Sequence, residues 1–239
     1  MIGRRETLIG TLALALPLQG CEEVYSYRYR LTLDFVVDGI TRSGSSVRSV
    51  RFSPPIKAFG NMSAGSFLTR GEAVIVDLGR AGYLFATFGE FWSLERGLSG
   101  TNWSPDHVFG RELGKADFAD RKAASKLRKR TKRILESAEL PILMRFKNLA
   151  DPTSAYVVDP TSMSAAYGPG VEFRQATVEI TRDKVSIGRV EGMLPWSGRY
   201  ASSGMHLGDE LPRGSERRYE LYAPISIFLM YPSNYNGFN

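Results

Sequence analysis

Apolar and polar side chains alternate strictly over residues 25–35. The apolar positions are Tyr25, Tyr27, Tyr29, Leu31, Leu33 and Phe35. A period of two residues predicts a β-strand with one buried face, so the three tyrosines are expected in the core. Asp38-Gly39 follows, and both residues tolerate a positive φ, which predicts a hairpin turn. Residues 45–52 are then expected to return as the second strand.

Further apolar runs predict more strands. Residues 73–78 and 83–88 are apolar except for Asp77 and Thr87 and flank a Gly-rich turn, which predicts a hairpin buried on both faces. Strands are also expected at 142–146, 155–158 and 171–180, with a closing hairpin around Pro224. Segments 91–110 and 197–215 have the composition of loops. Trp92 and Trp103 lie in the first of them and are candidates for exposed contacts.

The period changes to a helical one over residues 112–138. Ala116, Ala119 or Ala123, Leu127, Ile134 and Ala138 fall on one stripe, and lysines and arginines occupy the rest. This pattern predicts a long amphipathic helix with a dense basic face that ends before Pro141. Asp159-Pro160 places an N-cap aspartate before a first-turn proline, which predicts a short second helix over 161–167.

These elements predict an α+β fold: one strand-rich domain over residues 21–239, mainly antiparallel sheet, with one long basic helix and one short helix. The chain has 239 residues, of which 43% are hydrophobic. That is enough apolar material for a core, and it argues against disorder.

The first twenty residues have the composition of an export signal. Arg4 and Arg5 precede an apolar stretch over residues 8–18, which is too short to span a bilayer. The following Leu18-Gln19-Gly20-Cys21 resembles the lipobox of bacterial lipoproteins. The resemblance implies removal of residues 1–20, diacylglycerol on the Cys21 sulfur and N-acylation, and several acyl chains anchor a protein stably. The alternative is a buried N-terminal helix with an incidental cysteine.

The same region bears on export route and destination. Arg4-Arg5 partly resembles a twin-arginine signal, and an ordinary positively charged n-region explains it equally well. In lipoprotein sorting an aspartate after the lipidated cysteine favours the inner membrane, so Glu22 slightly favours the outer membrane. We therefore expect a periplasm-facing domain in the bacterial cell envelope. Because Cys21 is the single cysteine, no intramolecular disulfide can form.

Several segments of the mature chain resemble small uncharacterised proteins of proteobacteria. The segments are 27–32, 43–47, 140–143, 158–160, 168–173, 177–181 and 194–196. Together these segments hold 32 residues, spread from residue 27 to residue 196. The resemblance implies a shared fold, and it carries no activity and no catalytic residues.

The sequence lacks the common catalytic signatures. There is no H-E-x-x-H, no G-x-S-x-G and no phosphate-binding glycine motif. A hydrolase-like alternative would use His107 beside Asp106, or His206 near Asp209 and Glu210, with a loop serine such as Ser202 or Ser203. We expect no cofactor and no metal site, and the chain leans toward a non-enzymatic role.

Basic residues are the remaining candidates for function. The formal net charge is +6. The expected anionic-surface residues of the 112–138 helix are Lys122, Lys126, Arg128, Lys129, Arg130, Lys132 and Arg133. Near an anionic leaflet each contributes about 1 kcal/mol, although a solvated helix face explains them too. We therefore expect an envelope binding or scaffold module that meets anionic lipid head groups or an envelope protein. Export argues against nucleic acid as the partner.

Overall fold

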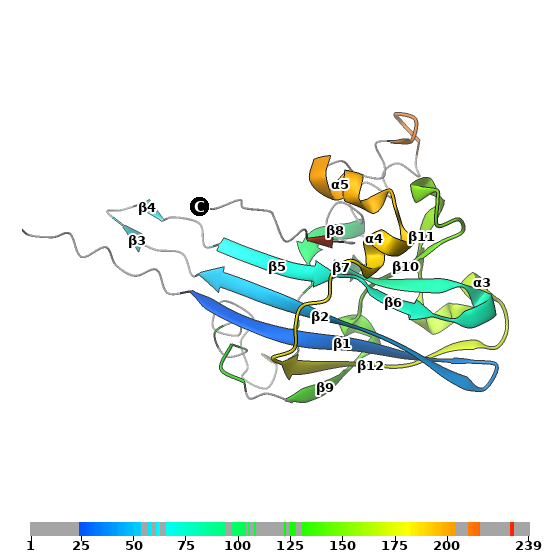
Figure 1. The fold of residues 1–239 in the computed structure, drawn as a ribbon, viewed down its shortest axis with the longest axis horizontal. Helices are drawn as coiled ribbons and strands as arrows, with labels where there is room; N and C mark the ends of the chain where they lie inside the picture. The colour runs from blue at the N-terminus through cyan, green and yellow to red at the C-terminus, as the bar shows by residue number, and fades with distance from the viewer. Residues whose placement is uncertain are drawn as a thin grey trace, which may run out of the picture.

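A computed structural model describes residues 24–53, 57–58, 61–62, 66–93, 97–103, 105, 108, 122, 125–127, 131–203, 210–215 and 230–231. Within these ranges the chain forms two antiparallel sheets that face each other, with short helices at one side (Figure 1). The predicted strand-rich, antiparallel architecture is therefore present.

The larger sheet has six strands. In spatial order they are β13 (Met230–Tyr231), β5 (Ser66–Glu72), β2 (Ile40–Ser53), β1 (Tyr25–Val37), β12 (Val171–Thr181) and β9 (Lys132–Leu135). β1 and β2 form the predicted hairpin, with Asp38 and Gly39 at φ values of 51° and 79°.

The second sheet has five strands. They are β11 (Ala155–Val158), β10 (Pro141–Phe146), β7 (Tyr83–Ser93) and β6 (Val74–Asp77), with β8 (Gly97–Asn102) paired to β7. A 3₁₀ turn, η1 (Gly79–Ala81), joins β6 to β7. β3 (Lys57–Ala58) and β4 (Asn61–Met62) form a separate two-stranded ribbon. The loop predicted over 91–110 is thus wrong at residues 91–93, which belong to β7, and at residues 97–102, which form β8.

The helices are short. They are α3 (Met163–Tyr167), α4 (Arg189–Met193) and α5 (Ser197–Ser203), with 3₁₀ turns η2 (Ser137–Glu139), η3 (Pro152–Ser154) and η4 (Pro160–Ser162). η4 and α3 form the predicted helix over 161–167, and Asp159 accepts a hydrogen bond from the N–H of Thr161 at 2.8 Å. α5 lies in a segment for which the sequence predicted a loop.

The predicted long basic helix over 112–138, and with it the predicted α+β fold class, is wrong. Among the described residues Lys122 and Ser125 are helical, Lys126 is in a turn, and residues 132–135 form β9. β9 pairs with β12 from Ala176–Leu135 to Glu179–Lys132. Burial therefore alternates as in a strand, with Leu135 buried and Ile134 67% exposed. Hydrogen bonding to the edge of β12 overrides a helical propensity that is only a weak prior.

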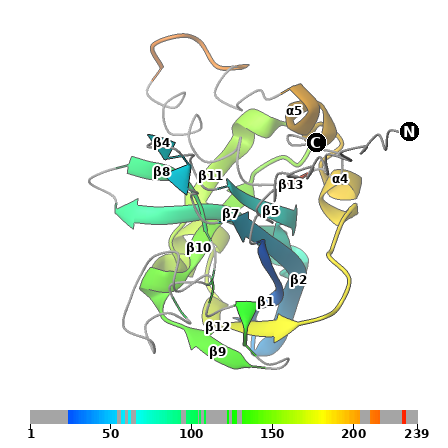
Figure 2. The same cartoon turned by 90° about the vertical axis from the view of Figure 1, so that its left-hand side faces the viewer.

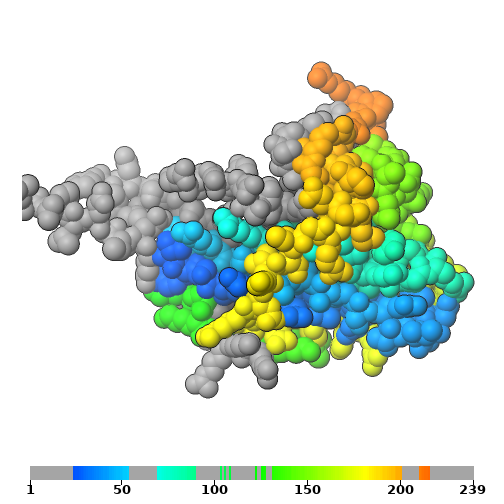
Figure 3. Space-filling model, viewed as in Figure 1, coloured from blue at the N-terminus to red at the C-terminus, as the bar shows by residue number. Residues whose placement is uncertain are grey.

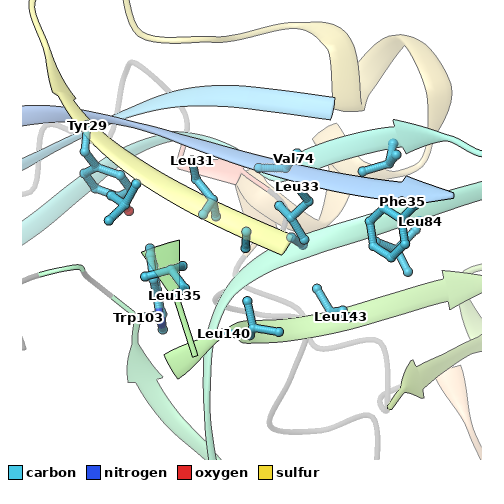
Figure 4. Close-up of a cluster of buried hydrophobic side chains, with 14 of the residues drawn as sticks. Tyr29, Leu31, Leu33, Phe35, Val74, Leu84, Trp103, Leu135, Leu140 and Leu143 are labelled. Carbon is cyan, nitrogen blue, oxygen red and sulfur yellow. The ribbon is translucent and has the colours of Figure 1, made fainter. Parts of the chain in front are cut away.

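Two hydrophobic layers hold the sheets and helices together. One lies between the sheets, where Leu31 and Leu33 of β1 point toward Leu140 and Leu143 (Figure 4). The other lies on the far face of the five-stranded sheet, where Phe85 packs in one cluster with residues of α4 and α5. The residues of this second layer include Ile75, Phe85, Phe88, Ile142, Met144, Val190 and Leu194.

These layers test two predictions about the aromatic residues. Tyr27 and Tyr29 are buried as expected, at 6% and 0% exposure. Trp103 is not an exposed contact, because it is 1% exposed and its indole N–H donates to the carbonyl of Glu139 at 2.7 Å. An indole packs well in a core when its N–H has a partner, which the loop composition of the sequence did not reveal.

Candidate functional site: a basic groove on the outer sheet face

The alternation that buries the tyrosines of β1 places Ser26, Arg28 and Arg30 on the opposite, outer face of the six-stranded sheet. Residues opposite each other in antiparallel strands share a face. The register pairs Ser26 with Arg51, Arg28 with Ser49, and Ser49 with Arg70. Arg28, Arg51 and Arg70 therefore lie on one face of three neighbouring strands, and all three are exposed.

Residues 182–188, here called the crossing segment, run over this outer face from β12 to α4 (yellow in Figures 2 and 3). Arg28 Nη1 donates to the carbonyls of Arg182 and Asp183 at 3.3 and 3.1 Å, and Arg30 forms an ion pair with Asp183. Ser186 and Val47 exchange two hydrogen bonds, each of 2.9 Å. The segment is thus fixed to both β1 and β2.

A groove of about 950 Å³ lies beside the crossing segment, at the end of the sheet where β1 begins. Five of the described residues that line it are cationic, and none is acidic. The cationic residues are Arg28, Arg51, Arg70, Lys126 and Arg182. Val185, Ile187 and Leu127 add apolar surface. We call this feature the basic groove. A concave surface lined by one sign of charge concentrates the field and attracts anions.

Among the described residues of the predicted anionic-surface set, only Lys126 lines the basic groove. Lys122 lies nearby but does not line the groove, and its Nζ lies 5.0 Å from the centre of the half-buried Tyr25 ring. The hydroxyl of Ser125 donates to the carbonyl of Lys122 at 2.7 Å. This contact fixes the turn that presents Lys126 to the groove.

The rest of the predicted set is not gathered with Lys126. Lys132 and Arg133 lie on β9, where Lys132 is exposed opposite Glu179 and Arg133 donates to the carbonyl of Lys132 at 3.0 Å. Arg128, Lys129 and Arg130 lie outside the described residues, as does Cys21. The described members thus form no single face, because residues 132–135 form a strand and do not continue the predicted helix.

The residues of the hydrolase alternative are not brought together by the described structure. His107, His206 and their aspartates lie outside the described residues, and Ser202 and Ser203 contribute backbone to α5. Across the described ranges there is no group of three or more His, Cys, Asp or Glu residues that could hold a metal ion. A search of those same ranges finds no helix long and apolar enough to cross a membrane.

A second polar cluster lies between the sheets and has a structural role. Arg48 is fully buried and donates to the carbonyls of Glu72, Thr87 and Ala86 at 3.1, 2.8 and 2.7 Å. Burial lowers the pKa of Arg48, whereas Tyr29 and the carboxylate of Glu72 favour its charged form. Because the guanidinium stays protonated and has no solvent access, it ties strands together and offers nothing to a ligand.

Glu72 extends this cluster to α4. Its carboxylate accepts hydrogen bonds from the backbone N–H groups of Arg189 and Val190 at 2.8 and 3.1 Å. A carboxylate at this position satisfies the free N–H groups of the helix start. The crossing segment is thereby fixed at its α4 end as well as over β1 and β2.

A smaller groove on the five-stranded sheet is a weaker candidate. Arg145 donates to the carbonyl of Ala166 and lies 4.3 Å above the Tyr167 ring, and Lys147 lies 5.6 Å from the Tyr156 ring. Burial raises the pKa of Tyr167, which keeps this phenol neutral. The two cations of the smaller groove, Arg145 and Lys147, already have intramolecular partners. In the basic groove, Arg51 and Arg70 have no ion pair among the described residues.

Sequence reasoning missed four of the five cations of the basic groove: Arg28, Arg51, Arg70 and Arg182. The signal for Arg28 was available, since it occupies an outward position of the alternating strand. Arg51 and Arg70 need the register of three strands, and Arg182 needs the path of the crossing segment. Comparisons with protein-family models, curated proteins and solved structures find no match for this chain, so its function is inferred from its sequence and geometry.

Proposed function

We propose that this chain is a lipid-anchored lipoprotein of the bacterial cell envelope whose domain binds an anionic ligand in the basic groove without catalysing a reaction. Diacylglycerol is attached to the Cys21 sulfur, residues 1–20 are then removed, and the new N-terminus is acylated. The observation that carries the proposal is the gathering of five cations, with no acid among the described residues that line the groove.

The n-region, apolar stretch and lipobox-like Leu18-Gln19-Gly20-Cys21 support the envelope location. The described fold begins at residue 24, three residues after Cys21. A domain that starts so close to its anchor is held near the membrane surface, without a long tether.

The chemistry of the groove supports binding over catalysis. Its polar side chains are guanidinium, ammonium and hydroxyl groups, including those of Ser26, Ser49 and Ser125. A serine nucleophile needs a neighbouring base, and the lining residues that the structure describes include no histidine, carboxylate or thiol. Fixed cations and hydroxyls are donors suited to phosphate or carboxylate oxygens.

Two measurements test the proposal. Mass spectrometry of the native protein should find an acylated Cys21 as the first residue, and a chain that begins at Met1 with a free thiol would contradict the anchor. Binding of a polyphosphate probe should weaken at least about tenfold in Arg51→Gln/Arg70→Gln, since a hydrogen bond to a charged group contributes about 1.5–3 kcal/mol.

The matched control is Arg42→Gln/Arg174→Gln. It removes the same charge from exposed positions of the same sheet, away from the groove. Equal weakening in the two double variants would show that net charge, and not the groove, determines binding, and would refute the proposal.

A further inference from the structure

We propose that the ligand of the basic groove is the phosphate head group of an anionic lipid in the same membrane that carries the anchor. The domain would then be attached at two points, by acyl chains at Cys21 and by the groove. This inference rests on the proposed function and narrows its ligand to one class.

The first argument is the short distance between anchor and groove. Ser26 and Tyr27 line the groove, and Ser26 follows Cys21 by 26 − 21 = 5 residues. A fully extended chain spans at most about 3.6 Å per residue, so the groove lies within about 18 Å of the lipidated residue. Rotation of the domain about this short link can bring the groove to within the Debye length of about 8 Å of the leaflet, where the leaflet attracts basic residues.

The second argument is the combination of charge and apolar surface. The crossing segment contributes Arg182 to the groove and also Val185 and Ile187. Ile187 is 65% exposed, so it offers apolar surface to a ligand beside the cations of the groove. A phospholipid offers both matching parts, a phosphate for the cations and glycerol and acyl carbons for the isoleucine. Free phosphate matches only the first.

The third argument is the polarity of the sheet along its strands. Arg51 lies near the anchored end of β2, and Arg42 lies 51 − 42 = 9 residues away on the same strand. At about 3.3 Å per residue this is roughly 30 Å, several Debye lengths. When the groove contacts the leaflet, charges at the hairpin end are therefore too far away to be attracted by it.

The experiment uses the mature chain, residues 21–239, with Cys21→Ser so that no lipid is attached. All buried hydrophobic residues of the described structure lie between Tyr27 and Tyr200, so removal of residues 1–20 leaves this core whole. Co-sedimentation is measured with vesicles of phosphatidylcholine alone and with vesicles that also contain phosphatidylglycerol. We expect binding only to the second kind.

Arg51→Gln/Arg70→Gln should weaken this binding about 25-fold, since each basic residue near the surface contributes about fivefold. Arg42→Gln/Arg174→Gln should leave it nearly unchanged. Ile187→Ser should weaken vesicle binding roughly tenfold by loss of buried apolar surface. It should not change binding of polyphosphate, because that probe has no apolar part.

Three outcomes would overturn the lipid assignment. They are polyphosphate binding that depends on the groove without vesicle binding, an equal loss in the control double variant, and an Ile187→Ser variant that binds vesicles normally. The first outcome leaves the proposed anionic-ligand function standing, so the two proposals fail separately. A circular dichroism spectrum of each variant shows whether a loss of binding reflects a loss of fold.

Discussion

The two sheets of this protein differ in what covers their faces. In the five-stranded sheet, Val74 and Leu84 point into the layer between the sheets, while Ile75 and Phe85 point toward α4 and α5. The six-stranded sheet buries Leu31 on one face and exposes Arg28 on the other. The five-stranded sheet is therefore an internal layer, whereas the six-stranded sheet has an outer face that can bind a ligand.

This difference explains the two sequence patterns and where polar groups occur. A sheet covered on both faces needs continuous apolar strands, and a sheet covered on one face needs alternation. Cations on the outer face keep their hydration and remain available to a ligand. The cation on the inner face, Arg48, is instead fully committed to carbonyl partners. The same substitution on the two faces of one strand, β2, should therefore change stability by very different amounts.

The largest expected effect is at Arg48. Arg48→Met leaves three buried carbonyls and the Glu72 carboxylate without their cation, so we expect a loss of about 3–5 kcal/mol in the free energy of unfolding. Arg51→Met, three residues along the same strand and exposed, should change it by less than about 0.5 kcal/mol. Urea unfolding of both variants checks this, and similar losses would contradict the distinction between the two faces.

The next effect concerns the closest approach of the two sheets. A Cβ atom at Gly44 of β2 would lie 2.2 Å from the carbonyl oxygen of Ile75 and 2.8 Å from Val76 Cγ2. Gly44→Ala should therefore cost about 1–3 kcal/mol, because backbone must move to admit the methyl group. Gly192→Ala in α4 meets nothing within 4 Å and should stabilise the protein by about 0.5–1 kcal/mol. Thermal unfolding should separate the two alanine variants in sign.

Much of the fold follows from local pattern. The alternation at 25–35, the Asp38-Gly39 turn and the apolar runs at 73–78 and 83–88 predict strands that the structure contains. The failure at 112–138 has a physical cause. Its lysines, arginines and alanines favour a helix locally, but residues 132–135 gain more by pairing with β12, some 40 residues later in the chain.

The basic groove could not be predicted in the same way. Arg28 lies 155 residues from Asp183, whose carbonyl it contacts, and Arg51 reaches the same surface only through the register of β1 with β2. Local periodicity assigns a residue to a face of its own strand, and it contains no information about which distant segment crosses that face. For this reason Lys126 is the only described member of the predicted basic set that lines the groove.

A smaller effect is expected where the crossing segment covers part of the open face. Ser186→Ala removes the acceptor for the N–H of Val47 and leaves the second bond, from the N–H of Ser186 to the carbonyl of Val47. We expect a loss of about 1 kcal/mol in the free energy of unfolding. Amide hydrogen exchange at Val47 should be faster in this variant than in the wild type. Exchange at Leu31, whose strand is paired on both sides, should not be accelerated. Equal acceleration at both would indicate global destabilisation instead.

The smallest effect is at the hairpin end, where Asp38 bonds to Arg80 at 2.7 and 2.8 Å. The hydrogen bond from Arg80 holds the pKa of Asp38 below its usual value of 3.8. A carboxylate with a lowered pKa in the folded state stabilises the protein above its unfolded pKa, and the contribution is lost as pH falls through the folded pKa.

Asp38→Asn keeps a residue that tolerates the φ of 51° and removes the charge. It should therefore be slightly less stable than the wild type near pH 7, and the difference should disappear between about pH 5 and about pH 2. Because both partners are exposed, added salt should shrink the difference as well. Urea midpoints across that pH range measure it, and a difference that persists in acid would mean that Asp38 acts through the turn geometry and not through its charge.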